Sequence, residues 1–255
     1  MVVLAAVSSP HYTHSQTPQQ QEIPRSAEDT DAPETNNSPD WVRPQDRPAE
    51  PWPGREHDLL HIQRLSVRGS LTDQKNALHM LSRHIEADRV RASDVEVMRL
   101  LEHMVLTGIR SARINPATPA DSTHARAIVR VQAVQLIASV GGPETEPVLS
   151  ELLSKEQSSL VLSYGVAAAR EIGKAPGPEL ESQLTAVAKR NNNVMHDEAL
   201  ARELIQTIEQ YYIRYGYTVQ PEMFREILRM AREAMTLSTR RQAAEAIRTL
   251  RGIPE

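Results

Sequence analysis

One pattern of apolar and small residues recurs along the chain and constrains its fold more than any other feature. It reads Val-Arg-x-x-Ala-x-x-Leu-Ile-x-x-Val-Gly, and its copies lie at residues 73–81 (a weaker copy), 129–141, 161–173, 197–208 and 239–252. The apolar positions fall at i, i+4, i+7, i+8 and i+11, which form one stripe along an α-helix. Each copy therefore predicts an amphipathic helix, and the small residue at its fifth position predicts close contact with a neighbouring helix.

The residues between the copies repeat as well. A glycine follows most copies, where a left-handed residue commonly ends a helix. A Pro-Glu pair then opens the next segment, at Pro143-Glu144, Pro178-Glu179 and Pro221-Glu222. Proline suits the first turn of a helix, and glutamate there complements the helix dipole. A shorter amphipathic stretch follows each pair, so the repeating unit is predicted to be a pair of helices.

A helix pair of this kind cannot bury its apolar stripes alone, so successive pairs must stack. The sequence thus predicts an all-α protein: residues 55–255 form an α-solenoid of about five antiparallel helix pairs. A proline-containing segment at residues 111–123 interrupts the array. In the copy at 129–141, Gln132, Gln135 and Ser139 are polar positions away from the stripe, and we expect them to bind a partner on the concave surface.

The copy at residues 129–141 resembles the second helix of HEAT-like repeats, of the short type found in phycobilisome lyases. The resemblance covers about residues 57–252 and is best from residue 124 onward. The arginine of the pattern is present at Arg130 and Arg240, but Gln74, Leu162 and Glu198 replace it in the other copies. The resemblance implies a HEAT-repeat scaffold for protein–protein interaction. It also leaves open an enzyme accessory or lyase, or a nucleic-acid-binding protein of HEAT-like type.

The N-terminal part differs in composition from the repeats. Residues 16–54 hold many prolines and acidic residues, and such a stretch buries too little apolar surface to offset its ordering entropy. We expect it to be a disordered tether. Residues 1–15 contain the apolar run Val2–Val7 and small residues at 13 and 15, which resembles the end of a truncated signal peptide. We therefore expect export to the periplasm, with a cytoplasmic protein as the alternative.

Composition and charge exclude several classes of function. The chain has no cysteine, which excludes disulfides, cysteine zinc sites and thiol nucleophiles. No apolar run is long enough to span a membrane. Residues 1–54 carry three arginines and eight acidic residues, whereas the rest is nearly neutral, with 26 basic and 25 acidic residues. A nearly neutral body argues against nucleic acid as the partner.

Aromatic residues are scarce, and four of the six tyrosines lie within seven residues: Tyr211, Tyr212, Tyr215 and Tyr217. Tyrosine combines apolar area with a polar group and is frequent at binding hot spots. The cluster is therefore a candidate partner-binding site, and the alternative is that the rings fill the core. For Trp41 and Trp52 the alternatives are a short binding motif and a cover over the first helix pair.

The sequence shows no convincing catalytic or metal-binding motif. His57 and His61 are one helical turn apart, a spacing that can bind a metal, but no third ligand lies nearby. The many arginines after residue 221 alternate with glutamates, which is typical of a salt-bridged surface. We therefore expect a non-catalytic scaffold without cofactor or metal, whose partner is another protein.

Overall fold

The computed structural model describes residues 49–107, 109, 120–232 and 235–252. The predicted signal segment at 1–15, the tether up to residue 48 and Trp41 lie outside these residues, as does most of the 111–123 interruption. All described residues fall within one compact unit.

The described residues are almost entirely helical and include no β-strand, which confirms the predicted all-α class. Three short helical turns, η2 (Pro143–Thr145), η3 (Arg170–Ile172) and the π-helical η4 (Asn191–Met195), accompany the α-helices. The α-helices are α1 (Arg55–Arg68), α2 (Leu71–Glu86), α3 (Val95–Leu106), α5 (Ala120–Val140), α6 (Glu146–Lys155), α7 (Ser159–Ala169), α8 (Pro178–Arg190), α9 (Glu198–Tyr215), α10 (Pro221–Arg232) and α11 (Leu237–Leu250).

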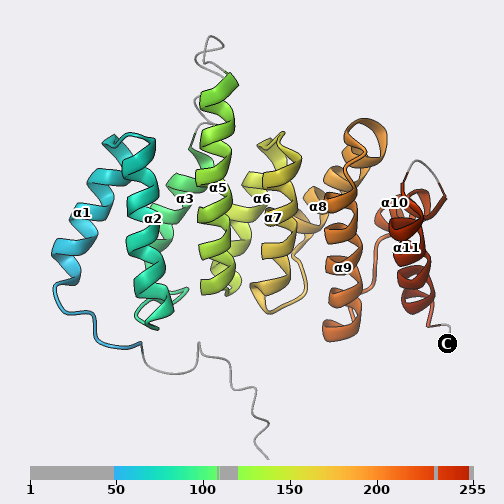
Figure 1. The fold of residues 1–255 in the computed structure, drawn as a ribbon. Coiled ribbons are helices and arrows are strands. Elements are labelled where there is room, and N and C mark those ends of the chain that lie inside the picture. The colour runs from blue at the N-terminus through green and yellow to red at the C-terminus, as the bar shows by residue number, and fades with distance from the viewer. Residues whose placement is uncertain (1–48, 108, 110–119, 233–234, 253–255) are drawn as a thin grey trace, which may run out of the picture. The chain divides into compact units, whose positions relative to one another are not determined.

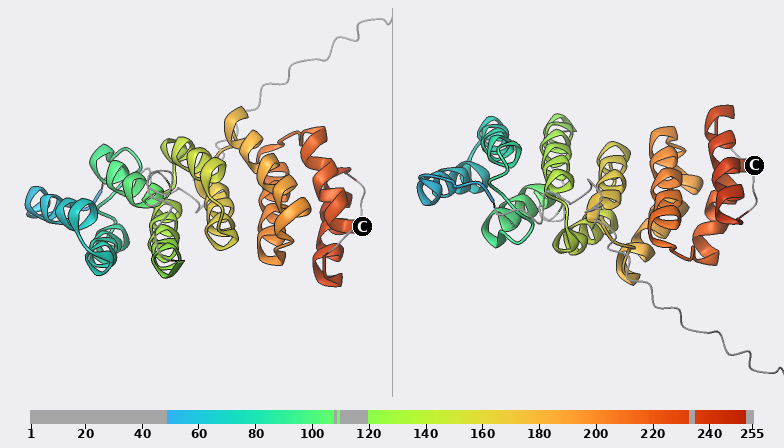
Figure 2. Two further views of the ribbon diagram at one scale, coloured as in Figure 1. Left: turned by 90° about the horizontal axis from the view of Figure 1, so that it is seen from above. Right: turned by 90° about the horizontal axis from the view of Figure 1, so that it is seen from below.

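The helices sort into two layers by their contacts. Helix α5 packs against α2 on one side and α7 on the other, α7 packs against α9, and α9 against α11. In the other layer α1 contacts α3, α3 contacts α6, α6 contacts α8, and α8 contacts α10. Figures 1 and 2 show the two series of helices. We call them the B layer (α2, α5, α7, α9, α11) and the A layer (α1, α3, α6, α8, α10). The repeat copies all lie in the B layer.

Local sequence signals explain where the helices begin and end. Ser70 caps α2 by accepting a hydrogen bond from the Asp73 backbone N–H, and the Asp73 carboxylate accepts one from the Ser70 backbone in return. Pro178 and Pro221 occupy the first positions of α8 and α10, as predicted from the Pro-Glu pairs. Gly141, Gly173, Gly216 and Gly252 have positive φ near the ends of α5, α7, α9 and α11, as predicted for glycines that end helices, whereas Asp88 takes this conformation after α2.

The small residues of the repeat lie inside the core, as predicted. Ala77, Ala133, Ala201 and Ala243 are fully buried. In α7 the position belongs to Gly165, where an added Cβ would lie 3.2 Å from the side chains of both Leu152 and Leu153. The glycine therefore lets α6 approach α7 more closely than an alanine would allow.

The repeat from residue 178 to 221 is longer than its neighbours for two reasons. Helix α8 runs into the five-residue turn η4, whose C-terminal neighbour His196 has a φ of 50°. Helix α9 then continues past the repeat pattern at 197–208 up to Tyr215. The apolar stripe of α9 continues past Ile208 to Tyr211, which is the last buried residue of α9 and the first residue of the tyrosine cluster.

Candidate partner-binding surface

An uncharged surface lies on the two central helices of the B layer, α5 and α7. The exposed side chains of Ala127–Val140 recur at one helical spacing, and so do those of Ser159–Ala169. They are Ile128, Gln132, Gln135 and Ser139 on α5, and Leu160 and Tyr164 on α7. We call these six residues the α5–α7 surface. Between Ala127 and Val140, and between Ser159 and Ala169, the one charged side chain is Arg130, and it is buried.

The sequence analysis identified half of this surface. Gln132, Gln135 and Ser139 are exposed, and the Ser139 hydroxyl donates to the Gln135 carbonyl, 3.0 Å away. The apolar members were missed: Ile128 is 36% exposed, Leu160 44% and Tyr164 36%. The repeat itself could have indicated them. When the copies at 129–141 and 161–173 are aligned, Leu160 takes the position of Ile128, and Tyr164 takes the position of Gln132.

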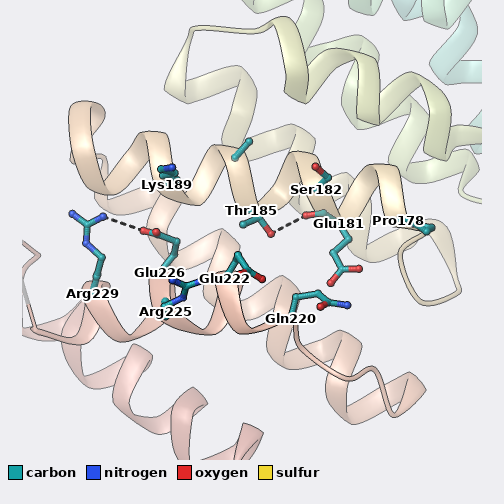
Figure 3. Close-up of a pocket in the computed structure, with 11 residues that line it drawn as sticks. Pro178, Glu181, Ser182, Thr185, Lys189, Gln220, Glu222, Arg225, Glu226 and Arg229 are labelled. Atoms are coloured by element: carbon teal, nitrogen blue, oxygen red, sulfur yellow. Dashed lines mark hydrogen bonds and ion pairs between the residues drawn. The ribbon is translucent and has the colours of Figure 1, made fainter.

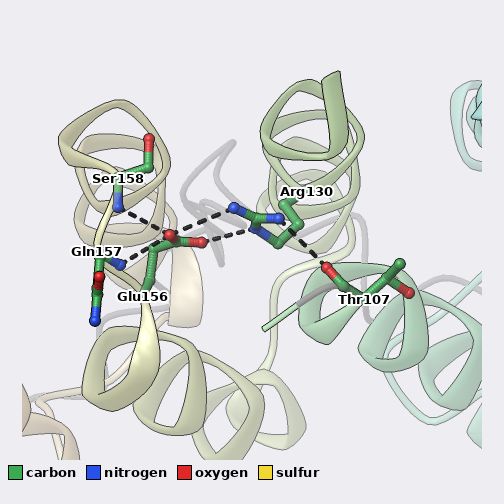
Figure 4. Close-up of polar contacts among 5 residues, drawn as sticks. All are labelled: Thr107, Arg130, Glu156, Gln157 and Ser158. Carbon is green, nitrogen blue, oxygen red and sulfur yellow. Dashed lines mark hydrogen bonds and ion pairs between the residues drawn. The ribbon is translucent and has the colours of Figure 1, made fainter. Parts of the chain in front are cut away.

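The arginine of the best repeat copy lies beneath this surface and holds three elements together. The Arg130 Nε atom donates to Glu156 Oε2 at 2.7 Å, and Nη1 donates to the Thr107 carbonyl at the end of α3. Glu156 Oε1 also accepts from the backbone N–H groups of Gln157 and Ser158, at 2.8 and 2.9 Å. Figure 4 shows this network, in which both charged side chains are about 5% exposed or less. It joins α5 to the α6–α7 turn and to α3.

The other repeat copies make different polar contacts at the arginine position. Gln74 Nε2 donates to the Ser66 carbonyl of α1, and Leu162 is buried without a polar group. Glu198 accepts hydrogen bonds from the hydroxyls of Thr236 and Thr239, which anchors the start of α11 to α9. The described repeats therefore share their apolar stripe and not a regular row of arginines.

The structure places Tyr211 in the core, the alternative that the sequence left open beside a partner-binding role. Its side chain is 1% exposed, and its hydroxyl donates to the Ala169 carbonyl of α7 at 2.5 Å. Its ring contacts those of Tyr215 and Tyr217, with centroids 6.2 and 6.1 Å apart. Tyr211 points inward because α9 continues its apolar stripe past Ile208. Burial raises the pKa of Tyr211 far above its ordinary value.

The other three tyrosines of the cluster are half-buried. The Tyr217 hydroxyl donates to the Glu181 carboxylate of α8, and burial followed by this hydrogen bond raises the pKa of Tyr217. Helix α7 lies between α5 and α9, so the structure does not bring the tyrosines together with Gln132, Gln135 and Ser139 (Figure 1). The tyrosine cluster connects α7, α8 and α9 and is separate from the α5–α7 surface.

Trp52 folds back onto the first helix pair, one of the two alternatives that the sequence left open. Its ring stacks on that of His84 in α2, with centroids 3.7 Å apart, and its Nε1 donates to Asp58 Oδ2 at 2.9 Å. The guanidinium of Arg55 lies 5.9 Å from the Trp52 ring centroid. Burial lowers the pKa of His84. The nearby negative charge of Asp58 raises this pKa by a smaller amount, and the positive charges of Arg89 and Arg83 lower it further.

Other site types find no support in the described part of the chain. Within it, no group of three or more histidine, aspartate or glutamate residues is placed to hold a metal ion, and His57 and His61 are both exposed. None of its helices has the length and apolar character needed to cross a bilayer.

Comparisons with known protein families, with curated proteins and with solved structures give no match to this chain.

Proposed function

We propose that this protein is a HEAT-like α-solenoid that binds another protein through the B layer, chiefly through the α5–α7 surface. The fold side of the proposal rests on the helix contacts. Five pairs, α1/α2, α3/α5, α6/α7, α8/α9 and α10/α11, each contribute one helix to each layer, and successive pairs contact one another in chain order. Stacked pairs of this kind form the extended surfaces that repeat proteins use for binding.

The single observation that supports the binding surface best is its lack of charge. Charged residues make up 24% of the chain, yet the exposed positions of α5 from Ala127 and of α7 up to Ala169 hold only apolar or neutral polar side chains. The centres of protein interfaces are depleted in charged residues and enriched in tyrosine. Tyr164, together with the apolar Leu160 and Ile128, fits this composition, and Gln132 and Gln135 offer neutral hydrogen-bonding groups.

In this proposal the chain acts as a scaffold, without a catalytic step or a cofactor of its own. A buried network at Arg130 and Glu156 supports the proposal, because it fixes α5 relative to α7 and so keeps the two halves of the surface in register. A surface that is already ordered loses less conformational entropy when it binds a partner.

Two substitutions on the α5–α7 surface test this function: one adds a charge and the other removes the tyrosine side chain. The full chain is tagged and purified from its native cells, from envelope and cytoplasmic fractions separately, as wild type, Gln135→Arg and Tyr164→Ala. A matched control, Gln63→Arg, places the same charge on an exposed position of α1 in the A layer. We expect a specific partner to be retained by wild type and control and to be lost, by about tenfold or more in affinity, from the two surface variants.

The melting temperature of each variant is also measured. An unchanged value shows that a variant which no longer binds the partner is still folded. A reproducible partner that binds all four proteins equally would overturn the assignment of the surface. Retention on DNA that falls steeply with salt would favour the nucleic-acid alternative instead.

A further inference from the structure

A groove runs between helices α8 and α10 of the A layer, on a different layer from the α5–α7 surface. Its volume is about 660 Å³. Figure 3 shows the two helices side by side with their side chains lining the groove. Its lining includes Glu181, Thr185 and Lys189 from α8, with Glu222, Arg225 and Arg229 from α10.

The charges along this groove are partly separated by sign. Glu181 and Glu222 lie toward the first turns of α8 and α10, whereas Lys189 and Arg229 lie toward the other end, as Figure 3 shows. Glu226 also lies at that other end, where it pairs with Arg229. The lining holds three acidic and three basic side chains, so its net charge is zero. Acids at helix starts and bases at helix ends also complement the helix dipoles, so this separation carries no electrostatic penalty for the fold.

The two ends of the groove keep charge available for a ligand. Within the described part of the chain Lys189 forms no ion pair, and its side chain is exposed. At the opposite end Glu181 Oε1 accepts from the Tyr217 hydroxyl, a neutral donor that leaves the negative charge of the carboxylate unneutralised. The other four charged side chains of the lining pair with each other: Arg225 pairs with Glu222 at 2.6 Å and Arg229 with Glu226 at 3.4 Å.

The spacing of these two charges selects the form of the ligand. Lys189 follows Glu181 by eight residues, which is about 12 Å along a helix. An extended peptide advances about 3.3 Å per residue and its side chains alternate between two faces, so side chains four residues apart lie on one face and match this separation. A nucleic acid or a wholly acidic peptide would place negative charge against Glu181 and Glu222.

We propose that the α8–α10 groove binds an extended peptide segment of a partner protein that carries one acidic and one basic side chain four residues apart. The acidic side chain pairs with Lys189, and the basic side chain pairs with Glu181. The aliphatic part of the lining, including Ala186 and the methyl group of Thr185, packs against the peptide backbone between them.

Labelled synthetic peptides test this proposal on the full chain, by fluorescence anisotropy at low salt. The first probe is Gly-Lys-Ser-Ala-Ser-Glu-Gly. Three others keep its length and replace the charged pair by two glutamines, two glutamates or two lysines. A short DNA duplex is the fifth probe. We expect the mixed-charge peptide to bind at least about fivefold more tightly than the neutral one, the contribution of a partly exposed ion pair.

Variants of the two end residues locate the binding. Lys189→Gln should weaken binding of the mixed-charge peptide by about fivefold, whereas Lys75→Gln, an exposed lysine on α2, should leave it unchanged. Lys189→Glu should reverse the preference, so that the peptide with two lysines now binds best. Equal binding of the acidic and mixed-charge peptides, tighter binding of DNA, an equal effect of Lys75→Gln, or no binding of any peptide would each overturn the proposal.

Discussion

Arg130 and Glu156 form a buried ion pair that connects the middle of α5 to the turn between α6 and α7, with 2.7 Å between Nε and Oε2. The two residues are 26 positions apart in the chain and belong to different helix pairs. Their contact is therefore a polar connection between two successive repeats.

Removing one partner of this pair should strongly destabilise the protein. In Arg130→Met the Glu156 carboxylate stays buried without its cation, and we expect a loss of about 3–5 kcal/mol in the free energy of unfolding. Glu156→Gln in the same chain should recover much of that loss, because the amide oxygen can still accept from the Gln157 and Ser158 backbone. Urea denaturation of wild type, both single variants and the double variant measures these differences. A double variant no more stable than Arg130→Met would contradict this account.

The repeat spacing predicted the B-layer helices and their buried stripe because both follow from a local 3.6-residue period. The Arg130–Glu156 pair was not predictable in this way. Glu156 lies in a turn outside the periodic pattern, and nothing local indicates which arginine will reach it. The same limit applies to Tyr211, whose direction depends on how far α9 continues beyond its repeat copy. The predicted surface residues on α5 were visible as gaps in the stripe, whereas their neighbours on α7 required knowledge of which helices are adjacent.

A charge at the fifth position of the repeat should disrupt packing between B-layer helices. Ala133 is fully buried, so Ala133→Arg would force an unpaired guanidinium into the core. We expect a loss of several kcal/mol, on the order of 4 kcal/mol, in the free energy of unfolding. Gln132→Arg places the same side chain on the exposed neighbour and should change stability by no more than about 0.5 kcal/mol. Thermal melts of the two variants compare them directly, and similar melting temperatures would show that the assigned register of α5 is wrong.

Tyr211 should behave as a core residue with one buried hydrogen bond. Tyr211→Phe removes the donor to the Ala169 carbonyl and should cost about 1 kcal/mol of stability. Tyr211→Ala also leaves a cavity and should cost about 3–5 kcal/mol. Tyr212→Ala, at the half-buried neighbour, is the matched control and should cost less than Tyr211→Ala. Denaturant unfolding of the three variants gives the order, and a Tyr212 variant less stable than the Tyr211 variant would contradict the placement.

The contact between Trp52 and His84 should make the stability of the first helix pair depend on pH. Because burial lowers the pKa of His84 below its ordinary 6.5, the unfolded chain binds a proton more readily than the folded one. This contribution leaves stability unchanged well above pH 6.5 and reduces it as the pH falls below 6.5 toward the folded pKa. The charge of Asp58, 3.7 Å from Nε2, opposes the shift in part, while Arg83 and Arg89 add to it.

Trp52 fluorescence and the unfolding midpoint, measured at pH 7.5 and pH 5.5, test this dependence. Wild type should lose more stability between the two pH values than His84→Gln, which cannot take up a proton at that position. His79→Gln changes an exposed histidine of the same helix and should keep the wild-type slope. If the protein with His84→Gln lost as much stability on acidification as wild type, the pH dependence would arise from other groups. Asp197 contributes in a separate range. Its carboxylate caps α9 by accepting from the Leu200 backbone N–H; burial raises its pKa, but this and other hydrogen bonds outweigh burial and lower it overall. Its stabilising effect is therefore lost only as the pH falls toward and below 3.8.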